Sequence, residues 1–313
     1  MQIHPWVNYE SILQKCLVGR LVRCKTPATV SDLTKAFFEA PPPKPCLEII
    51  DEGCRDESIF DSDIKMTWCQ TSQKINFKFA CKVSSPHIVV ILKPENRVRI
   101  LLRVKKKLHV FSFKLENKVI WPCYVSVNTD TGRIDIEFTK KEEGCWDNYG
   151  VNDKDHAIIA YSVDEIETYH KARIISINQV THNVRTFVFK FIDKVYMWVP
   201  IGHDIRIRAI IEGMDYAKQY TPIPPCLPHC DQTIKHWHND YICCMVKYYS
   251  DGALTPYLFS KKERDIVEIG GMSGSFNIRK LNHVKELYLI AAGSGISPML
   301  RILVWGISKK DQV

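Results

Sequence analysis

A glycine loop near the end of the sequence has the residue types of a phosphate-binding turn. The apolar run LYLIAA, residues 287–292, is followed by Gly293-Ser294-Gly295 and then by Pro298 and Met299. A short apolar run bounded by glycine predicts a buried strand, and proline suits the first turn of a helix. Free N–H groups and the positive end of the helix dipole then face a phosphate. An ordinary strand–turn–helix stays the alternative, because Pro298 stands where the third glycine of GxGxxG belongs.

A second motif carries an aromatic ring, a hydroxyl and a cation within a few residues. The run Lys218-Gln219-Tyr220-Thr221-Pro222 follows a strand predicted over Asp204–Ile211. The two motifs, (R/K)xYTP and G-(S/T)-G-I-(S/T)-P-M, together resemble the ferredoxin–NADP reductase superfamily, specifically the NADH–cytochrome b5 reductases. The lysine in place of the usual arginine is most similar to the cytochrome b5 reductase 4 type, which fuses a b5 domain, a CS domain and a reductase.

The resemblance implies an enzyme that passes electrons from NAD(P)H through FAD to a haem protein such as a cytochrome b5 domain. In that family Lys218 would neutralise an FAD phosphate, and Tyr220 would lie against the flavin ring. Thr221 would place its hydroxyl near the flavin N5, so Tyr220 and Thr221 are the expected catalytic residues. Pro222 would fix the backbone between them.

Two further sets of residues match the family's cofactor contacts. The resemblance places one set on the ribityl, adenine and pyrophosphate side of FAD: Lys247, Tyr249, Gly252, Leu254 and Thr255. It places the other set on the nicotinamide side: Gly293, Gly295, Ser297, Pro298 and Met299. Ser297 replaces the commoner threonine but keeps a hydroxyl.

Composition limits the classes of protein that the chain can represent. With 313 residues, two or three domains are expected, and 45% hydrophobic with 25% charged residues is typical of globular proteins. No apolar run approaches the length of a membrane span, and we expect no N-terminal signal. The 12 scattered cysteines favour reduced thiols in the cytoplasm, while the resemblance implies association with the endoplasmic reticulum. The net charge of +8 suits an acidic protein partner or phosphate-bearing cofactors; no nucleic-acid module is recognisable.

The order of patterns predicts a mainly β fold in several domains. We expect a remnant of a cytochrome b5-like domain over 1–23, a linker over 24–61 that contains the run PPPKP, and a CS domain, a p23-like β-sandwich, over 62–153. A six-stranded FAD-binding β-barrel is expected over 165–281, followed by the first βα unit of a Rossmann-like NAD domain over 284–313. Eighteen residues follow Gly295, too few for several βαβ units, so we expect a chain truncated at both ends whose activity is uncertain.

Short alternating runs with turn signals between them predict the strands of the first domain. They cover Lys74–Cys81, His87–Leu92, Arg97–Val104, His109–Leu115 and Arg133–Phe138. The order W-x-Q-T at Trp68 and Lys140-Lys141 before Trp146 resembles a CS domain. Trp68, Trp121 and Trp146 are expected in or beside the core rather than in a ligand site. In the second domain, strands are predicted over Tyr169–Gln179, Asn183–Phe191, Tyr241–Tyr249 and Asp265–Ile269, with a short helix over Thr255–Ser260.

Three alternatives remain open from the residues alone. His4 matches the family's second haem-ligating histidine, but no other part of a haem pocket precedes it, so haem is not expected in this chain. A zinc site is conceivable in a cysteine- and histidine-rich stretch, although the spacing is irregular and no metal is predicted. This stretch contains Cys226, His229, Cys230, His236, His238, Cys243 and Cys244. Lastly, the chain could be an interaction protein that uses its CS domain to bind a partner while the reductase half is inert.

Overall fold

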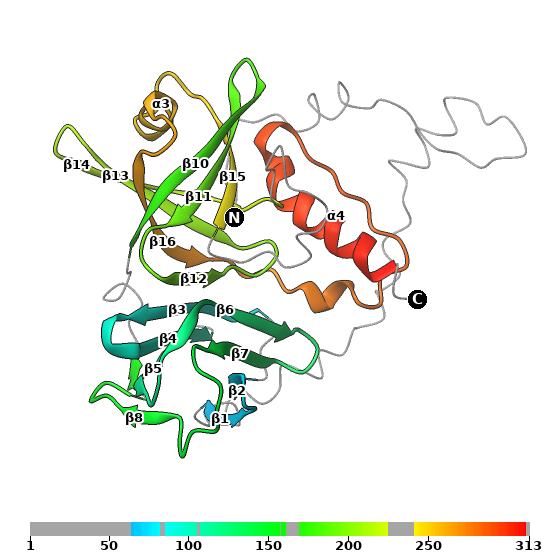
Figure 1. The fold of residues 1–313 in the computed structure, drawn as a ribbon. Helices are drawn as coiled ribbons and strands as arrows, with labels where there is room; N and C mark the ends of the chain where they lie inside the picture. The colour runs from blue at the N-terminus through cyan, green and yellow to red at the C-terminus, as the bar shows by residue number, and fades with distance from the viewer. Residues whose placement is uncertain are drawn as a thin grey trace, which may run out of the picture. The chain divides into compact units, whose positions relative to one another are not determined.

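Antiparallel β-strands form most of the described structure, as the sequence predicts (Figure 1). The computed structural model describes residues 64–81, 85–104, 107–156, 158–160, 169–224 and 241–310. The chain divides into two units, residues 1–62 and 63–313, and all described residues lie in the second unit. The expectations for His4, for the linker and for the zinc candidates from Cys226 to His238 lie outside the described residues.

Two antiparallel sheets make up the first half of this unit. The first has the order β1-β2-β7-β6, with β1 at Lys65–Gln70, β2 at Lys74–Ala80, β7 at Arg133–Lys140 and β6 at Val119–Asn128. The second contains β3 at His87–Lys93, β4 at Arg97–Val104, β5 at Lys107–Leu115, β8 at Gly150–Asn152 and β9 at Ile158–Ala160. The turn η2, Pro94–Asn96, connects β3 to β4. The predicted strands are confirmed, and β6, β8 and β9 are additions. The register of β6 shifts between Ile120 and Tyr124, around a proline that cannot donate to the ladder.

The inner faces of these two sheets share one apolar core, which is the arrangement of a β-sandwich. Phe77 and Phe138 from the first sheet and Phe113 from the second are fully buried. The rings of Phe77 and Phe113 lie 4.8 Å apart between centroids. Trp146 is buried in the same core, and Trp68 and Trp121 pack against it, so the prediction of core tryptophans is confirmed.

A buried lysine closes one end of the sandwich. Lys140 is only 3% exposed, and its ammonium donates to the side chain of Gln70 at 2.6 Å and to the carbonyls of Thr71 and Gly144. It also lies 5.0 Å from the centre of the Trp146 ring. Gln70 accepts from the Trp146 N–H at 2.9 Å and donates to its carbonyl at 2.7 Å. The W-x-Q-T segment and the Lys-Lys segment of the sequence therefore meet in one hydrogen-bonded cluster.

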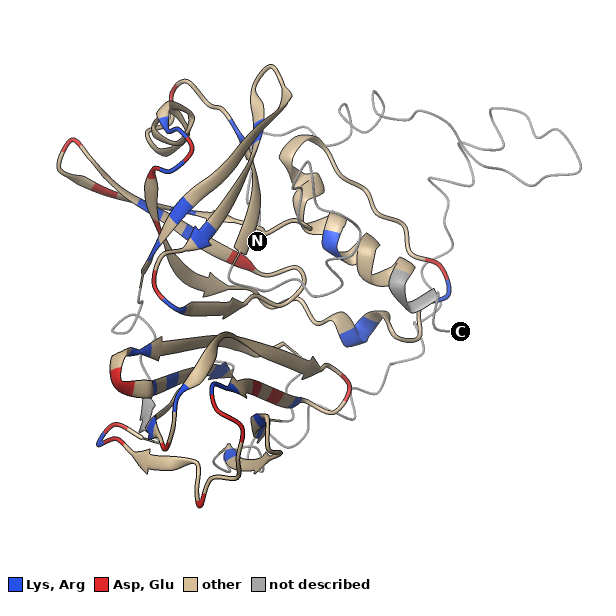
Figure 2. Cartoon of the chain, in the orientation of Figure 1, with Lys and Arg blue, Asp and Glu red and all other residues tan. Residues whose placement is uncertain are grey.

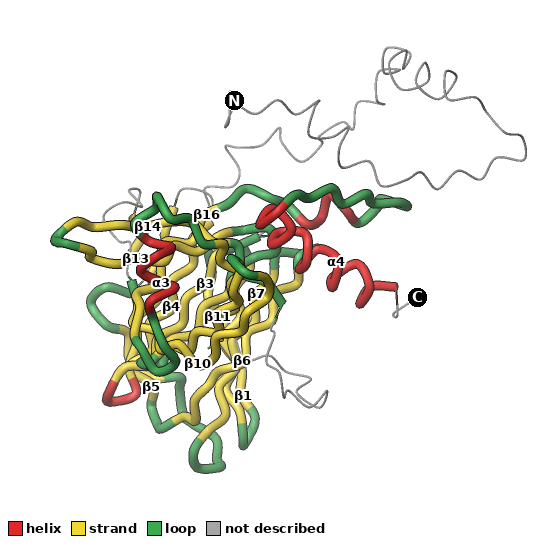
Figure 3. Tube along the Cα trace, turned by 90° about the horizontal axis from the view of Figure 1, so that it is seen from above, coloured by secondary structure: helices red, strands yellow, loops and turns green. Residues whose placement is uncertain are grey.

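A third antiparallel sheet forms the second half, in the order β14-β13-β16-β10-β11-β15. Its strands are β10 at His170–Thr181, β11 at Val184–Phe191, β13 at Asp204–Ile211, β14 at Met214–Tyr220, β15 at Tyr241–Lys247 and β16 at Ile266–Ser273. The helix α3, Leu254–Ser260, packs against β13 and β14 and buries Leu254 and Leu258 (Figure 3). Six strands and one short helix agree with the predicted flavin domain.

The strand β3 is buried on both faces and joins the two halves. Ile88, Val90 and Leu92 point into the sandwich core, while Val89 lies in the core of the third sheet. The short strand β12, Val195–Trp198, belongs to the second half by sequence but pairs antiparallel with β3. The nearly continuous apolar sequence HIVVIL thus reflects a strand with two dry faces rather than one.

The C-terminal part of the chain corrects one expectation. Residues 287–292, predicted as a buried strand, form no strand, and Tyr288 and Ile290 are 80% and 77% exposed. A strand needs a neighbour for its backbone groups, and no described strand pairs with this segment. The turn η5, Gly293–Ile296, and the helix α4, Ser297–Lys310, do follow as the sequence predicts. Among the described residues, no helix is long and apolar enough to cross a membrane.

The Lys140 cluster predicts a large difference between two adjacent lysines. Lys140→Met removes three hydrogen bonds and leaves the carbonyls of Thr71 and Gly144 without the lysine donor, so the free energy of unfolding in urea should fall by about 2–4 kcal/mol. Lys141→Met is the matched control, since Lys141 is exposed and its loss should change stability by less than about 0.5 kcal/mol. Equal effects of the two substitutions would contradict the role given to the cluster.

Candidate functional site

A cavity of about 490 Å³ gathers residues from four separate parts of the second half. It is lined by the end of β14 and the residue after it, by β15 and the turn beyond, by the loop before α3 together with the start of that helix, and by the first residues of η5 and α4. The lining residues are Lys218, Gln219, Tyr220, Thr221, Met245, Lys247, Tyr249, Asp251, Gly252, Ala253, Leu254, Thr255, Ser294 and Ser297. Its size is that of a pocket for a small organic ligand.

Tyr220 supplies an aromatic ring at the end of β14. It pairs with Ile205 of β13 and packs against the core of the third sheet. Burial raises the pKa of the Tyr220 phenol well above its ordinary value, so the group stays neutral at physiological pH. A neutral, fixed ring at a cavity wall suits stacking on a planar ligand.

Thr221 supplies a hydroxyl that already donates a hydrogen bond within the protein. The Thr221 hydroxyl donates a short hydrogen bond to a carboxylate oxygen of Asp204, the first residue of β13. Its oxygen therefore offers lone pairs, rather than a proton, to a ligand in the cavity, and it suits an N–H donor. Sequence reasoning missed Asp204, because only the pairing of β13 with β14 brings it to Thr221.

The far end of the cavity carries positive charge and a tight loop. The Lys247 ammonium lies 5.4 Å from the centre of the Tyr249 ring. Thr255 ties the loop to itself, because its hydroxyl donates to the Tyr249 carbonyl at 3.1 Å and accepts from the Tyr249 N–H at 3.1 Å. A β-carbon at Gly252 would lie 3.4 Å from this hydroxyl, an ordinary van der Waals distance, and the Gly252 N–H donates to the Tyr249 carbonyl at 3.2 Å. In this structure Thr255 shapes the loop rather than presenting a free hydroxyl.

The glycine loop reaches the cavity through its serines. Ser294 and the buried Ser297 line it, whereas Gly293, Gly295, Pro298 and Met299 do not. Gly293 adopts a φ of 54°, a left-handed conformation that favours glycine. Sequence reasoning did not select Ser294 as a lining residue, although it stands inside the motif.

Helix α4 is held in place by Arg301, whose side chain is half-buried. The Arg301 guanidinium donates to the Val199 carbonyl at 2.8 Å and to the Pro200 carbonyl at 3.2 Å. Burial lowers the pKa of Arg301 to about 10. Pro222 is buried beside this contact and lines a separate, largely apolar cavity of about 350 Å³ rather than the first one. The expectation that Pro222 fixes the backbone beside Thr221 stays a prediction.

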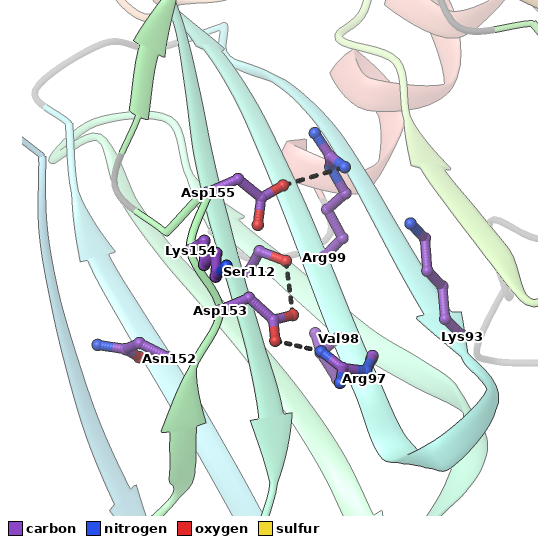
Figure 4. A pocket seen from close by; sticks show the side chains of 9 residues that line it. All are labelled: Lys93, Arg97, Val98, Arg99, Ser112, Asn152, Asp153, Lys154 and Asp155. Atoms are coloured by element: carbon purple, nitrogen blue, oxygen red, sulfur yellow. Dashed lines mark hydrogen bonds and ion pairs between the residues drawn. The ribbon is translucent and has the colours of Figure 1, made fainter.

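A further cavity, of about 520 Å³, is lined by several charged side chains of the sandwich (Figure 4). Figure 2 marks where basic and acidic residues lie along the chain. Arg97 and the Ser112 hydroxyl both contact the Asp153 carboxylate, the hydroxyl at 3.1 Å. Arg99 pairs with Asp155 at 3.1 Å. Lys93 and Lys154 line the same cavity, so its four basic side chains outnumber its two carboxylates and leave an excess of positive charge.

The described residues include no group of three or more histidine, cysteine or acidic side chains that could hold a metal ion. Of the zinc candidates, only Cys243 and Cys244 are described. Both are buried neighbours on β15 and so point to opposite faces of the sheet.

Comparisons with known proteins agree with this geometry. The family model described as "Oxidoreductase FAD-binding domain" matches residues 171–278. Human cytochrome b5 reductase 4 is 29% identical over 312 residues, which cover 98% of this chain and 58% of that protein. NADH-cytochrome b5 reductase 1 of Dictyostelium discoideum is 30% identical over 138 residues, 44% of each chain. The solved structure of the CS-b5R domains of human Ncb5or, in its NAD+ form, matches with a TM-score of 0.58 and 28% identity, over 79% of this chain and 70% of that one.

The predicted resemblance to the cytochrome b5 reductase 4 type is therefore confirmed, and the chain contains an oxidoreductase FAD-binding domain. The prediction of a CS-type sandwich before the flavin domain agrees with the structural match. The chain spans about 58% of the length of the cytochrome b5 reductase 4 relatives that it matches.

The contact between Arg301 and the Val199–Pro200 carbonyls predicts how firmly α4 is docked. Arg301→Met removes two charge-assisted hydrogen bonds, so the free energy of unfolding should fall by about 2 kcal/mol and amide exchange in α4 should accelerate. Arg279→Met is the control, because Arg279 is exposed in the turn η4, Ile278–Leu281. Unchanged exchange in α4 would show that other contacts hold the helix.

Proposed function

We propose that this chain is an NAD(P)H–cytochrome b5 reductase-type flavoprotein, which binds FAD in the 490 Å³ cavity and passes electrons from a nicotinamide to a haem protein. One observation carries the proposal: nine of the residues that the resemblance assigns to cofactor contacts line a single cavity. These are Lys218, Tyr220, Thr221, Lys247, Tyr249, Gly252, Leu254, Thr255 and Ser297. They come from distant parts of the sequence, so their convergence is a property of the fold.

The residues of the cavity fit the chemical parts of FAD. Tyr220 offers a neutral aromatic face for a flat ring, and Lys218 and Lys247 offer positive charge for phosphates. Gly252 lines the cavity and has no side chain, so a pyrophosphate can approach the loop closely at this point. When bound, the flavin supplies the hydride and electron chemistry, and the protein supplies position and electrostatics.

The Thr221 hydroxyl can accept a hydrogen bond from a ligand, and this favours a reduced flavin. Its hydroxyl proton is held by Asp204, so its oxygen can accept a hydrogen bond from a ring N–H. The reduced flavin carries such an N–H at N5, whereas the oxidised form has a lone pair there. We therefore assign Thr221 to the N5 side of the ring and Asp204 to the control of its hydroxyl.

The electron acceptor in this proposal is a haem protein such as a cytochrome b5 domain, in line with the names of the relatives. The net charge of +8 suits an acidic partner. We place the protein in the cytoplasm, in association with the endoplasmic reticulum. The alternative, an adaptor that binds a partner through its CS domain beside an inert reductase half, predicts a folded but colourless protein after reconstitution with FAD.

Substitution of Tyr220 should test the flavin site directly. Tyr220→Ala should weaken FAD binding by about 1–3 kcal/mol, because it removes a stacking partner and its buried area. Thr221→Val should change flavin reduction more than FAD affinity, since the hydroxyl is lost and the shape is kept. Tyr288→Ala is the control for both, because Tyr288 is 80% exposed and lies outside the cavity. FAD titration by fluorescence measures the affinities, and wild-type affinity in Tyr220→Ala would contradict the stacking role.

Reduction of the bound flavin by two reductants should distinguish FAD binding from hydride transfer by NADH. We expect dithionite to bleach FAD fully, while NADH bleaches it slowly, because the segment before the glycine loop forms no strand and leaves Tyr288 and Ile290 exposed. Fixed positioning of the two rings is needed for fast hydride transfer. Stopped-flow reduction by NADH at about 10 per second or faster, an ordinary enzymatic rate, would contradict this expectation.

A further inference from the structure

Two buried histidines meet where the sandwich contacts the flavin domain. His87 is the first residue of β3, and His203 directly precedes β13. His87 Nε2 and His203 Nδ1 lie 2.7 Å apart, with the rings almost perpendicular at 85°. The two side chains are only 6% and 3% exposed. This contact is therefore a hydrogen bond in a dry environment between two domains.

The partners of each ring fix its tautomer. His203 Nε2 lies 2.8 Å from the Phe276 carbonyl, which can only accept, so Nε2 carries the proton. In a neutral ring His203 Nδ1 is then an acceptor, and His87 donates to it through Nε2. His87 Nδ1 is buried without a hydrogen-bond partner among the described residues. Burial, followed by the nearby His203 and Arg103, lowers the pKa of His87 to about 3, and burial also lowers the pKa of His203.

The surroundings of His203 leave the ring little room to move. A β-carbon at Gly274, whose φ is 142°, would lie 2.6 Å from His203 Cγ. The sandwich half, called the CS half below, forms two more hydrogen bonds to the segment from Met272 to Phe276. Ser85 donates to the Phe276 carbonyl at 3.3 Å, and Arg103 donates to the Met272 carbonyl at 2.7 Å. Residues 272–276 and His203 are thus held from the side of the sandwich.

His203 and the segment 272–276 are also connected to residues that line the 490 Å³ cavity. Asp204 follows His203, pairs with Ser273 across β13 and β16, and accepts from the Thr221 hydroxyl. Gln219, which lines the cavity, donates to the Ser273 hydroxyl at 2.8 Å. A short path of direct contacts therefore runs from His87 through His203 and Asp204 to Thr221.

We propose that His87 is a positioning residue for the flavin site. By holding His203 it fixes Asp204, so that the Thr221 hydroxyl keeps donating its hydrogen bond to Asp204 and presents its lone pairs to the cavity. The CS domain thereby sets the direction of the Thr221 hydroxyl without contacting the cofactor itself. This inference rests on the proposed function, because it assumes that FAD occupies the cavity.

Two amide substitutions of His87 form a matched pair for the test. The amide nitrogen of Gln can occupy the position of the imidazole Nε2, whereas that of Asn reaches only the position of Nδ1. His87→Gln therefore keeps the hydrogen-bond donor to His203, and His87→Asn loses it. Both variants bury one amide group at this position, so they differ mainly in that hydrogen bond. His109→Phe controls for the loss of a buried histidine elsewhere in the same sheet.

The measured quantity is the ratio of reduced to oxidised FAD in equilibrium with a reference dye, together with the Kd of FAD. In His87→Asn this ratio should fall about five- to tenfold, the effect of losing one hydrogen bond to the reduced ring, while the Kd changes less than threefold. His87→Gln and His109→Phe should stay close to the wild type. In an Asp204→Ala background His87→Asn should have no further effect, because both changes act through the same hydroxyl.

Several results would overturn the proposal. An unchanged ratio in His87→Asn, equal ratios in the Asn and Gln variants, or additive effects with Asp204→Ala would remove the positioning role. Unfolding of both His87 variants would reduce the histidine pair to a folding contact. Imidazole ¹⁵N shifts of the FAD-free wild type should show His203 protonated at Nε2, and protonation at Nδ1 would exclude the path. If the wild type binds no FAD, the proposed function fails, while the ¹⁵N shifts still decide whether the histidine pair exists as described.

Discussion

The hydrogen bond between His87 and His203 joins side chains 116 positions apart, both withdrawn from water. An unpaired imidazole N–H in such a place is costly, so the two halves must keep their relative position for the bond to persist. Apolar packing supports the same arrangement. Val89, Leu101 and Val110 belong to strands of the sandwich, but their side chains are buried in the core of the third sheet. The CS half is therefore a structural part of the flavin domain rather than a module tethered to it.

The sequence predicts those parts of the fold that depend on local patterns. The boundaries of β4 agree to the residue, and the helix α3 begins within one residue of the expectation. The cofactor motifs are also local, since Tyr220 and Thr221 are adjacent in the sequence, at and just after the end of β14. Such features need only alternation, turn residues and a short-range motif to be recognised.

Features that depend on contacts between distant residues could not be predicted in this way. Asp204 meets Thr221 only through the β13–β14 pairing, and His87 meets His203 only through the contact of two domains. The strand expected at 287–292 fails for the same reason: an apolar run becomes a strand only when a neighbour supplies its hydrogen bonds. The apolar character of β3 was visible, but its meaning, a strand with two buried faces, required the structure.

The need for outside support follows from the way in which β14 is held. Most of its residues are exposed, and it pairs with β13 alone at the edge of the sheet. Thr221 follows this strand, and Pro222 and Ile223 next to it are buried and bonded to β15. The backbone at Thr221 is thus fixed by these neighbours, and the direction of its hydroxyl is set by the contacts at the base of the hairpin. Those contacts pass through Asp204 and Ser273, and both lie in the strip that the CS half grips by Ser85, His87 and Arg103. A hydroxyl that the proposed function assigns to the flavin can in this way be oriented by a domain that takes no part in the chemistry, which gives a physical reason for the two domains to share one chain.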